Sequence, residues 1–152
     1  MTVAETLKNL GIELPAVAKP VAAYVPAVVA GKWVYISGQL PFRQGKLEKT
    51  GKVGSDVTLE DAYVEAKQCA INCMAALQSV VGDLDNVLRI VKVTGFVASA
   101  PGFNDQPKVV NGASELLGQV FGEAGKHARA AVGVAELPLN ACVEVELIAL
   151  LK

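Results

Sequence analysis

Charged side chains are scarce in this sequence. They make up 19% of its 152 residues, whereas about a quarter is usual for a soluble domain. The formal net charge is −1, and lysine and arginine nowhere form a run. Nucleic-acid binding takes most of its affinity from clustered basic side chains, often interleaved with aromatic ones. The composition therefore counts against a nucleic-acid partner.

Long apolar runs and a leader are missing as well. No stretch approaches the ~20 apolar residues of a membrane-spanning helix, so we expect no membrane partner. The first residues lack a basic region followed by an apolar run, and no secretion signal is predicted. Three cysteines without such a signal favour free thiols and a cytoplasmic location.

A metal-binding pattern is not present either. Cys69 and Cys73 are four residues apart on a predicted helix, but no histidine or third cysteine follows at the spacing of a zinc site. Free cysteine is among the most buried residue types, so core packing is the favoured interpretation. We expect no bound metal.

Hydrophobic residues, by contrast, are abundant at 52% of the chain. This length and composition suit one compact domain over residues 1–152, in which residues 1–19 form an N-terminal extension. A short helix is expected within that extension, from Ala4 to Leu10. A low-charge, apolar domain often buries further surface by associating with copies of itself.

The hydrophobic periodicity predicts two long helices and five strands. One helix follows a segment resembling a capping box, Thr58–Asp61, and ends at Gly82; the other begins near Asp105 and ends at Gly125. Alternation with period two, or a β-branched run, marks the strands at residues 22–29, 33–37, 87–98, 128–134 and 142–150. The segment from Pro41 to Ser55 has no such period and is expected to be an exposed loop, with Arg43 as a solvated charge.

These elements predict an α+β domain with a mixed sheet and both helices packed on one face. The helices are rich in alanine, which allows a close approach to the sheet. The other face, to which we assign His127, Arg129 and Ala131, has no cover within the chain. Because few polar residues lie on it, we expect another subunit to cover it.

Arg129 is unusual for its position. A guanidinium on a strand of alanine, valine and glycine needs an anionic partner or water, because burial without a partner is costly. Glu144 and Glu146 lie on one face of the last strand, opposite Val143, and could form a structural ion pair with it. The alternative is an arginine that binds a carboxylate ligand through its planar fork.

Two motifs in this sequence resemble those of the RidA/YjgF family of reactive enamine/imine deaminases. The first is R-x-x-V-x-V-x-x-L-P-x-x-x-x-V-E-V-E-x-I-A, which begins at Arg129 and ends at Ala149. The second is Tyr24 followed by G-x-x-x-Y-I-S-G-Q-L-P, which ends at Pro41. Asn111 falls where the family has an asparagine on its second helix. The resemblance spans about residues 20–151.

The resemblance implies an α+β homotrimer with a chorismate-mutase-like fold and ligand clefts between subunits. The implied reaction is hydrolysis of enamines and imines resembling 2-aminoacrylate to 2-keto acids and ammonia, without a metal or cofactor. In that reaction Arg129 would hold the substrate carboxylate and Glu144 would position or polarise the attacking water. The cleft would be lined by Ser37, Gly38 and Asn111 and closed across the interface by Tyr24.

Some of these residues also have ordinary interpretations. Tyr24 can be a strand aromatic and Gly38 a turn glycine. Family members generally work without a histidine at the position of His127, so a structural role is favoured there. Ala131 stands where many members have a cysteine. This difference leaves the expected fold unchanged, but the substrate of this chain need not be the same as theirs.

Two other functions are compatible with the resemblance. The protein could bind a small carboxylate as a regulator without turning it over, which would need Arg129 but not Glu144. An endoribonuclease activity is also ascribed to parts of the family. The acidic balance and the lack of a basic stripe make that the least favoured of the three.

Overall fold

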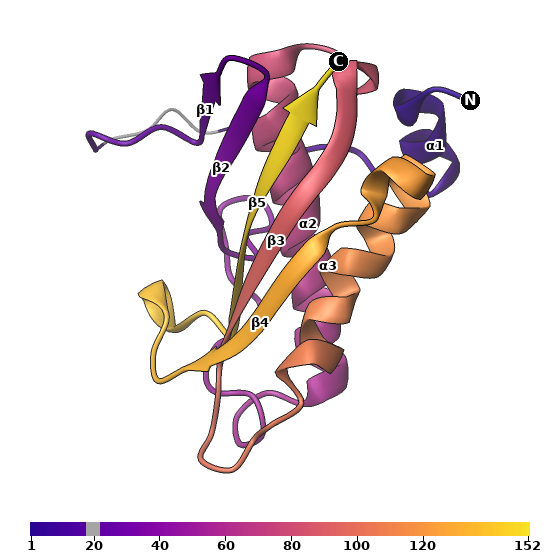
Figure 1. Ribbon diagram of the computed structural model, residues 1–152. Helices are drawn as coiled ribbons and strands as arrows, with labels where there is room; N and C mark the ends of the chain where they lie inside the picture. Colours follow the sequence, from indigo (N-terminus) through magenta and orange to yellow (C-terminus); the bar gives the residue numbers. More distant parts are fainter. Residues whose placement is uncertain (18–21) are drawn as a thin grey trace.

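The computed structural model describes residues 1–17 and 22–152, so the end of the expected extension, residues 18 and 19, lies outside the described residues. Figure 1 shows a sheet with two long helices behind it and the N-terminal helix beside them. The helices are α1 (Val3–Asn9), α2 (Leu59–Val81) and α3 (Gln106–Phe121), with short 3-10 turns η1 (Leu84–Asn86), η2 (Gly122–Gly125) and η3 (Pro138–Asn140). The strands are β1 (Ala27–Ala30), β2 (Trp33–Gln39), β3 (Val87–Ala98), β4 (Ala128–Val134) and β5 (Val143–Leu151).

The five strands form one mixed sheet in the order β1-β2-β5-β3-β4. The pair β3–β4 is parallel and the other pairs are antiparallel. Both long helices cover the same face, and the core lies between them and the sheet. The predicted α+β architecture, with a mixed sheet and two helices on one face, is therefore confirmed. No helix in the described ranges is long and apolar enough to cross a membrane.

The two cysteines of α2 belong to the core, as predicted. Cys69 and Cys73 are fully buried, and their thiols lie 3.7 Å and 3.4 Å from the carbonyl oxygens of Val143 and Val145 on β5. Burial raises the pKa of both thiols well above the ordinary value, so they remain protonated. Within residues 1–17 and 22–152 no cluster of three or more possible metal-ligating side chains occurs.

The strand registers decide which side chains share a face. Arg129 on β4 lies opposite Val93 on β3, which lies opposite Leu147 on β5. Val93 and Leu147 are buried beneath the helices, so this row belongs to the helix-covered face. His127 also lies on this side, since its ring contacts Ser114 of α3. The assignment of His127, Arg129 and Ala131 to the uncovered face was therefore wrong.

Glu144 belongs to the uncovered face. It lies opposite Phe96 on β3, and Phe96 lies opposite Val132 on β4. These residues alternate with the buried Val143, Val145 and Val97. The strand registers thus define the uncovered and the helix-covered face on the interior strands β5 and β3 and on the edge strand β4.

Two expected segments differ in the structure. The first strand begins at Ala27, and of the expected strand 22–29 the residues 22–26 are irregular. The segment from Pro41 to Ser55 is not uniformly exposed, because Pro41, Gly51 and Val53 are buried. Arg43 is no solvated charge: its Nη1 donates at 2.7 Å and 3.0 Å to the carboxylate of Glu65, which is 2% exposed on α2.

The second long helix also ends earlier than expected. α3 stops at Phe121, with Gly122 at positive φ as its cap, and the 3-10 turn η2 continues to Gly125. Its first turn contains Pro107, as the sequence predicted. The turn η2 leads directly into β4, so it places His127 and Arg129 beside α3.

Candidate functional site

Arg129 is held against α3 by neutral groups. Its Nη1 donates to Asn111 Oδ1 at 2.8 Å and to Ser114 Oγ at 3.2 Å, and its Nη2 lies 3.4 Å from the carbonyl oxygen of Pro107. All three acceptors belong to α3, within residues 107–114. β4 and α3 together therefore fix one edge of the guanidinium.

The other edge of this guanidinium is available. In the described part of the chain, Nε of Arg129 has no hydrogen-bond partner and no carboxylate lies within ion-pair distance of the side chain. The structural ion pair with Glu144 or Glu146 is therefore absent within the subunit. The free Nε–H and the second hydrogen of Nη2, the one not donated to Pro107, match the two oxygens of a carboxylate.

His127 adjoins the same group of residues. Its Nε2 lies 2.8 Å from Ser114 Oγ, and its Nδ1 lies 2.6 Å from the carbonyl oxygen of Gly125. Burial, with a smaller contribution from the positive charge of Arg129, lowers the pKa of the imidazole below its ordinary value. The histidine is therefore neutral at pH 7.

Two other candidates, Ser37 and Gly38, lie with Glu144 on the uncovered face, and Tyr24 lies on the segment just before β1. Gly38 lies within the bulge of β2 between Ile36 and Gln39 and against Glu144, so that a side chain at this position would collide with the carboxylate. Ser37 Oγ donates to the carbonyl oxygen of Val25 at 2.6 Å, which ties β2 to the segment carrying Tyr24. Tyr24 itself is 67% exposed.

Glu144 is the half-buried carboxylate of this second group. Its pKa is raised, mainly by burial and also by the neighbouring negative charge of Glu146. A carboxyl with a raised pKa exchanges a proton more readily near neutrality than an ordinary surface glutamate. Its environment therefore suits a proton-handling role.

The candidates thus form two groups on opposite faces of the sheet. The arginine group contains Arg129, Asn111, Ser114 and His127, on the helix-covered face at the edge strand β4. The glutamate group contains Glu144, Gly38 and Ser37 on the uncovered face, together with Tyr24 on the segment that Ser37 ties to β2. The strand β3 lies between β4 and β5, so a single subunit cannot present both groups to one small ligand.

Sequence reasoning missed Ser114, although a signal for it existed. Ser114 comes three residues after Asn111 on α3, and residues at this spacing share a helix face. Two polar side chains at positions i and i+3 of a helix that packs beside the arginine strand indicate that both can bond the arginine. The Gly125 carbonyl could not be found this way, because its position depends on the end of α3.

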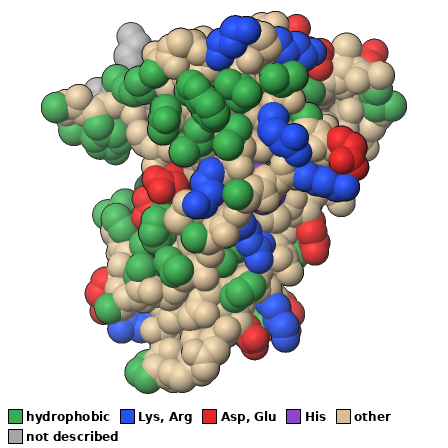
Figure 2. Space-filling view, viewed as in Figure 1, with side chains coloured by type: hydrophobic (Ala, Val, Ile, Leu, Met, Phe, Trp, Pro, Cys, Tyr) green, Lys and Arg blue, Asp and Glu red, His purple; other side chains and the backbone are tan. Residues whose placement is uncertain are grey.

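The uncovered face carries many apolar side chains. Figure 2 shows hydrophobic side chains gathered over β1 and β2 on this face. Val28, Trp33, Tyr35 and Val132 are between 43% and 50% exposed. Exposed apolar surface of this kind is typical of an interface.

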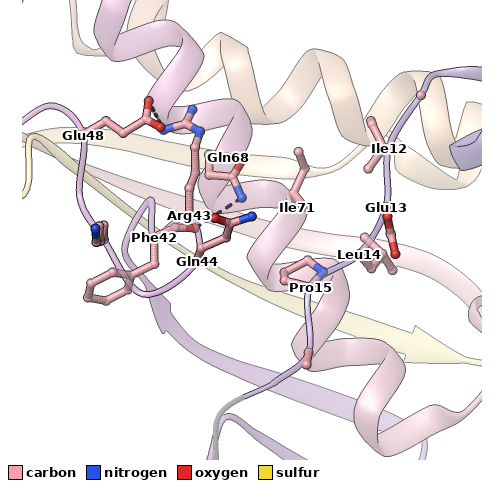
Figure 3. A pocket seen from close by; sticks show the side chains of 13 residues that line it. Ile12, Glu13, Leu14, Pro15, Phe42, Arg43, Gln44, Glu48, Gln68 and Ile71 are labelled. Carbon is pink, nitrogen blue, oxygen red and sulfur yellow. Dashed lines mark hydrogen bonds and ion pairs between the residues drawn. The ribbon is translucent and has the colours of Figure 1, made fainter.

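A hollow of about 800 Å³ lies elsewhere, over α2 (Figure 3). It is lined by the segment Gly11–Ala16, by the turn around Arg43 and by Gln68 and Ile71 of α2. No residue of the arginine group or the glutamate group lines it, and its arginine is already paired with Glu48 and Glu65. The hollow is therefore not the candidate functional site, despite its volume.

Comparison with known proteins assigns the family. A family model described as "YjgF/chorismate_mutase-like, putative endoribonuclease" matches residues 5–151. The chain belongs to the RidA/YjgF family. The fold is accordingly the chorismate-mutase-like one that the sequence motifs predicted, and the family covers nearly the whole chain.

Individual family members differ in what they are named for. Protein TCP17 of Trypanosoma cruzi is 46% identical over 145 residues, covering 95% of this chain and 91% of that protein. A 2-iminobutanoate/2-iminopropanoate deaminase of Dermatophagoides farinae is 32% identical over 141 residues, covering 93% of this chain and 95% of that protein. A crystal structure of a protein with unknown function from Agrobacterium tumefaciens superimposes with a TM-score of 0.91 at 45% identity, covering 99% of this chain and 92% of that one.

Proposed function

We propose that this protein hydrolyses reactive enamines and imines of the 2-aminoacrylate type to 2-keto acids and ammonia. The observation that carries the proposal is the guanidinium of Arg129, anchored on one edge by Asn111 and Ser114 and without a carboxylate partner in the described chain. Such a group is preorganised for a ligand carboxylate. The relationship to a named iminobutanoate deaminase supports the choice of substrate class.

The reaction needs little beyond positioning and proton transfer. Water adds to the imine carbon, one of its protons passes to the imine nitrogen, and the resulting carbinolamine expels ammonia to leave the keto group. Arg129 binds the carboxylate attached to that carbon and so fixes its place. Glu144, with its raised pKa, accepts a proton from the water and returns one to the leaving nitrogen.

The two groups of residues act together in an oligomer. Because Arg129 and Glu144 lie on opposite faces of one sheet, we propose that a complete site takes the arginine group from one copy and the glutamate group from its neighbour. The apolar uncovered face supports such an association, and β4, as an edge strand, brings Arg129 to the border of that face. We propose a homotrimer, in which Tyr24 closes the site across the interface.

The test is release of keto acid from imines generated in situ by a serine or threonine dehydratase. The wild-type protein should accelerate release above the spontaneous rate. Arg129→Ala should abolish the acceleration, and Arg129→Lys should lose most of it, because a point charge does not replace the bidentate fork. Near-normal turnover in either variant would refute the carboxylate-binding role.

The regulatory alternative is separated by Glu144→Gln. The deaminase proposal predicts that this variant still binds pyruvate, measured by calorimetry, while hydrolysis slows by about a hundredfold, the lower range for a positioned proton-transfer group. Unchanged turnover with weakened binding would favour a protein that senses a carboxylate without converting it.

A further inference from the structure

The hydrogen bonds around His127 run in one direction. A carbonyl oxygen can only accept, so the contact of 2.6 Å between Nδ1 and the Gly125 oxygen requires the proton on Nδ1. In the neutral ring, Nε2 is then an acceptor, and the Ser114 hydroxyl donates to it over 2.8 Å. The tautomer is thus determined by its partners.

This direction determines what Ser114 offers to Arg129. With its proton given to His127, the Ser114 oxygen has its lone pairs available and accepts from Arg129 Nη1 at 3.2 Å. A continuous series of donations therefore runs from Arg129 to Ser114, then to His127 and finally to the Gly125 carbonyl. The last group is rigidly held, because Gly125 is buried and packs against the Leu117 carbonyl at the end of α3.

We propose that His127 is a positioning residue for Arg129, acting through Ser114. The histidine fixes the rotamer and the hydrogen direction of Ser114, and Ser114 with Asn111 fixes the guanidinium so that its Nε–Nη2 edge faces the ligand. This inference rests on the proposed function, since it concerns the affinity of Arg129 for a carboxylate. It assigns a role to the single histidine of the chain without placing it in contact with substrate.

The surroundings keep the histidine in the neutral form that this role needs. The pKa of the ring is lowered by burial and by Arg129. Most other charges on the adjoining elements have their own partners: Lys126 pairs with Glu123 at 2.7 Å, Lys108 of α3 with Asp105 at 3.7 Å, Arg89 of β3 donates to the Lys126 carbonyl, and Glu115 of α3 accepts from Tyr63. Lys92 of β3 lies on the uncovered face, away from His127. None of these neighbours offers His127 a counter-ion.

Two near-isosteric variants distinguish the contributions of the two ring nitrogens of His127. In His127→Asn the side-chain amide reaches the position of Nδ1 and keeps a donor for Gly125, but Ser114 loses its acceptor. In His127→Gln the amide oxygen reaches the position of Nε2 and can accept from Ser114. The Ser114→Ala variant removes the link to Arg129 altogether.

The measurement is pyruvate affinity by calorimetry for each variant, with the concentration dependence of keto-acid release as a second readout. His127→Asn and Ser114→Ala should each weaken binding about tenfold, since each loses a hydrogen bond on which a charged group depends. The loss should lie in KM rather than kcat. His127→Gln should recover most of it, and the double variant Ser114→Ala with His127→Asn should be no weaker than Ser114→Ala alone.

The Arg129→Ala variant distinguishes failure of the proposed function from failure of the positioning role of His127. If that variant still binds pyruvate, the proposed function has failed and the positioning role with it. If Arg129→Ala abolishes binding while His127→Asn binds like the wild type, only the positioning role is refuted. Equal losses in His127→Asn and His127→Gln would also overturn it, because a merely structural histidine would show no preference for the half of the ring that faces Ser114.

Discussion

At the scale of single residues, the arrangement around Arg129 explains how an arginine can be held in place without being neutralised. Asn111 and Ser114 accept from one of its terminal nitrogens, and neither carries a charge. The positive charge therefore remains available to a ligand. A carboxylate in the same position would have fixed the side chain equally well but would have competed with any anionic substrate.

The titration of His127 gives a prediction at this scale. Its folded pKa lies below the ordinary value of 6.5, so below that pH the unfolded chain takes up the proton first. Stability should therefore fall as the pH is lowered from 7 towards the folded pKa, and His127→Gln should lack this part of the loss. Melting temperatures of both proteins at pH 7 and pH 5.5 measure the difference.

A nuclear magnetic resonance titration provides the control, because the chain has one imidazole. The midpoint should lie below 6.5 and the neutral ring should carry its proton on Nδ1. A midpoint above 6.5, or a wild-type protein that gains stability on acidification relative to His127→Gln, would contradict the account.

At the scale of helices and strands, α2 and α3 pack closely at one glycine. A side chain at Gly112 on α3 would collide with the carbonyl of Tyr63 on α2, whereas a side chain at Gly118 would meet open space. By helix propensity alone, both glycines would weaken the helix to a similar extent. The structure separates them, because one is a contact point between helices and the other is not.

These two glycines therefore form a matched pair. Gly112→Ala should destabilise the protein by roughly 1–3 kcal/mol, as overpacking does, and should loosen the contact that holds Asn111 and Ser114 in place. Gly118→Ala should stabilise it by up to about 1 kcal/mol through helix propensity. Denaturant unfolding measures both, and a Gly112→Ala protein as stable as Gly118→Ala would show that the helices have room to separate.

The elements themselves were largely predictable. The β-branched run from Val87 to Ala98, the small-residue strand from Ala128 to Val134 and the capped helix after Thr58 all occur as expected, because each has a strong local pattern. The face occupied by Arg129 was not predictable. Its strand carries alanine, valine or glycine on both sides, so the alternation that identified the face of Glu144 gave no information there.

The candidate site was predictable only in part for a related reason. Asn111 and Arg129 meet as the family motifs suggested, but the partners of Arg43 and His127 come from elements distant in sequence. Arg43 bonds Glu65, 22 residues away, and His127 bonds Ser114 across a helix and a turn. Local patterns do not encode such contacts, which depend on the packing of α2 and α3 against the loops.

At the scale of the whole molecule, the uncovered face is where a single subunit leaves large apolar side chains exposed to water. Trp33 and Tyr35 on β2 lie in it, exposed by 43% and 50%. Such side chains lose unfavourable contact with water when a second copy covers them. The same association would bring Glu144 of one copy towards the border of another.

Oligomeric state is the corresponding prediction. Sedimentation equilibrium at micromolar concentration should give three times the chain mass of 15.8 kDa. Replacing Tyr35 in the uncovered face by glutamate should shift the protein towards smaller species, whereas glutamate at Val64, 49% exposed on α2 behind the sheet, should not. A wild-type monomer would refute the shared site.

Complementation between two inactive variants tests the central claim most directly. Arg129→Ala and Glu144→Gln each remove one half of the proposed site, and each should be nearly inactive alone. If the halves come from neighbouring copies, each site takes Arg129 from one copy and Glu144 from the next. In a one-to-one mixture, the copy that supplies the arginine is intact there in half of the sites, and so, independently, is the copy that supplies the glutamate. After unfolding and refolding together, about one site in four should then be complete.

The quantity to measure is keto-acid release per subunit by the refolded mixture, with each variant refolded alone as its control. The account predicts about a quarter of the wild-type acceleration. A mixture no more active than the separate variants would contradict it, because Arg129 and Glu144 would then not meet at a site shared between two copies.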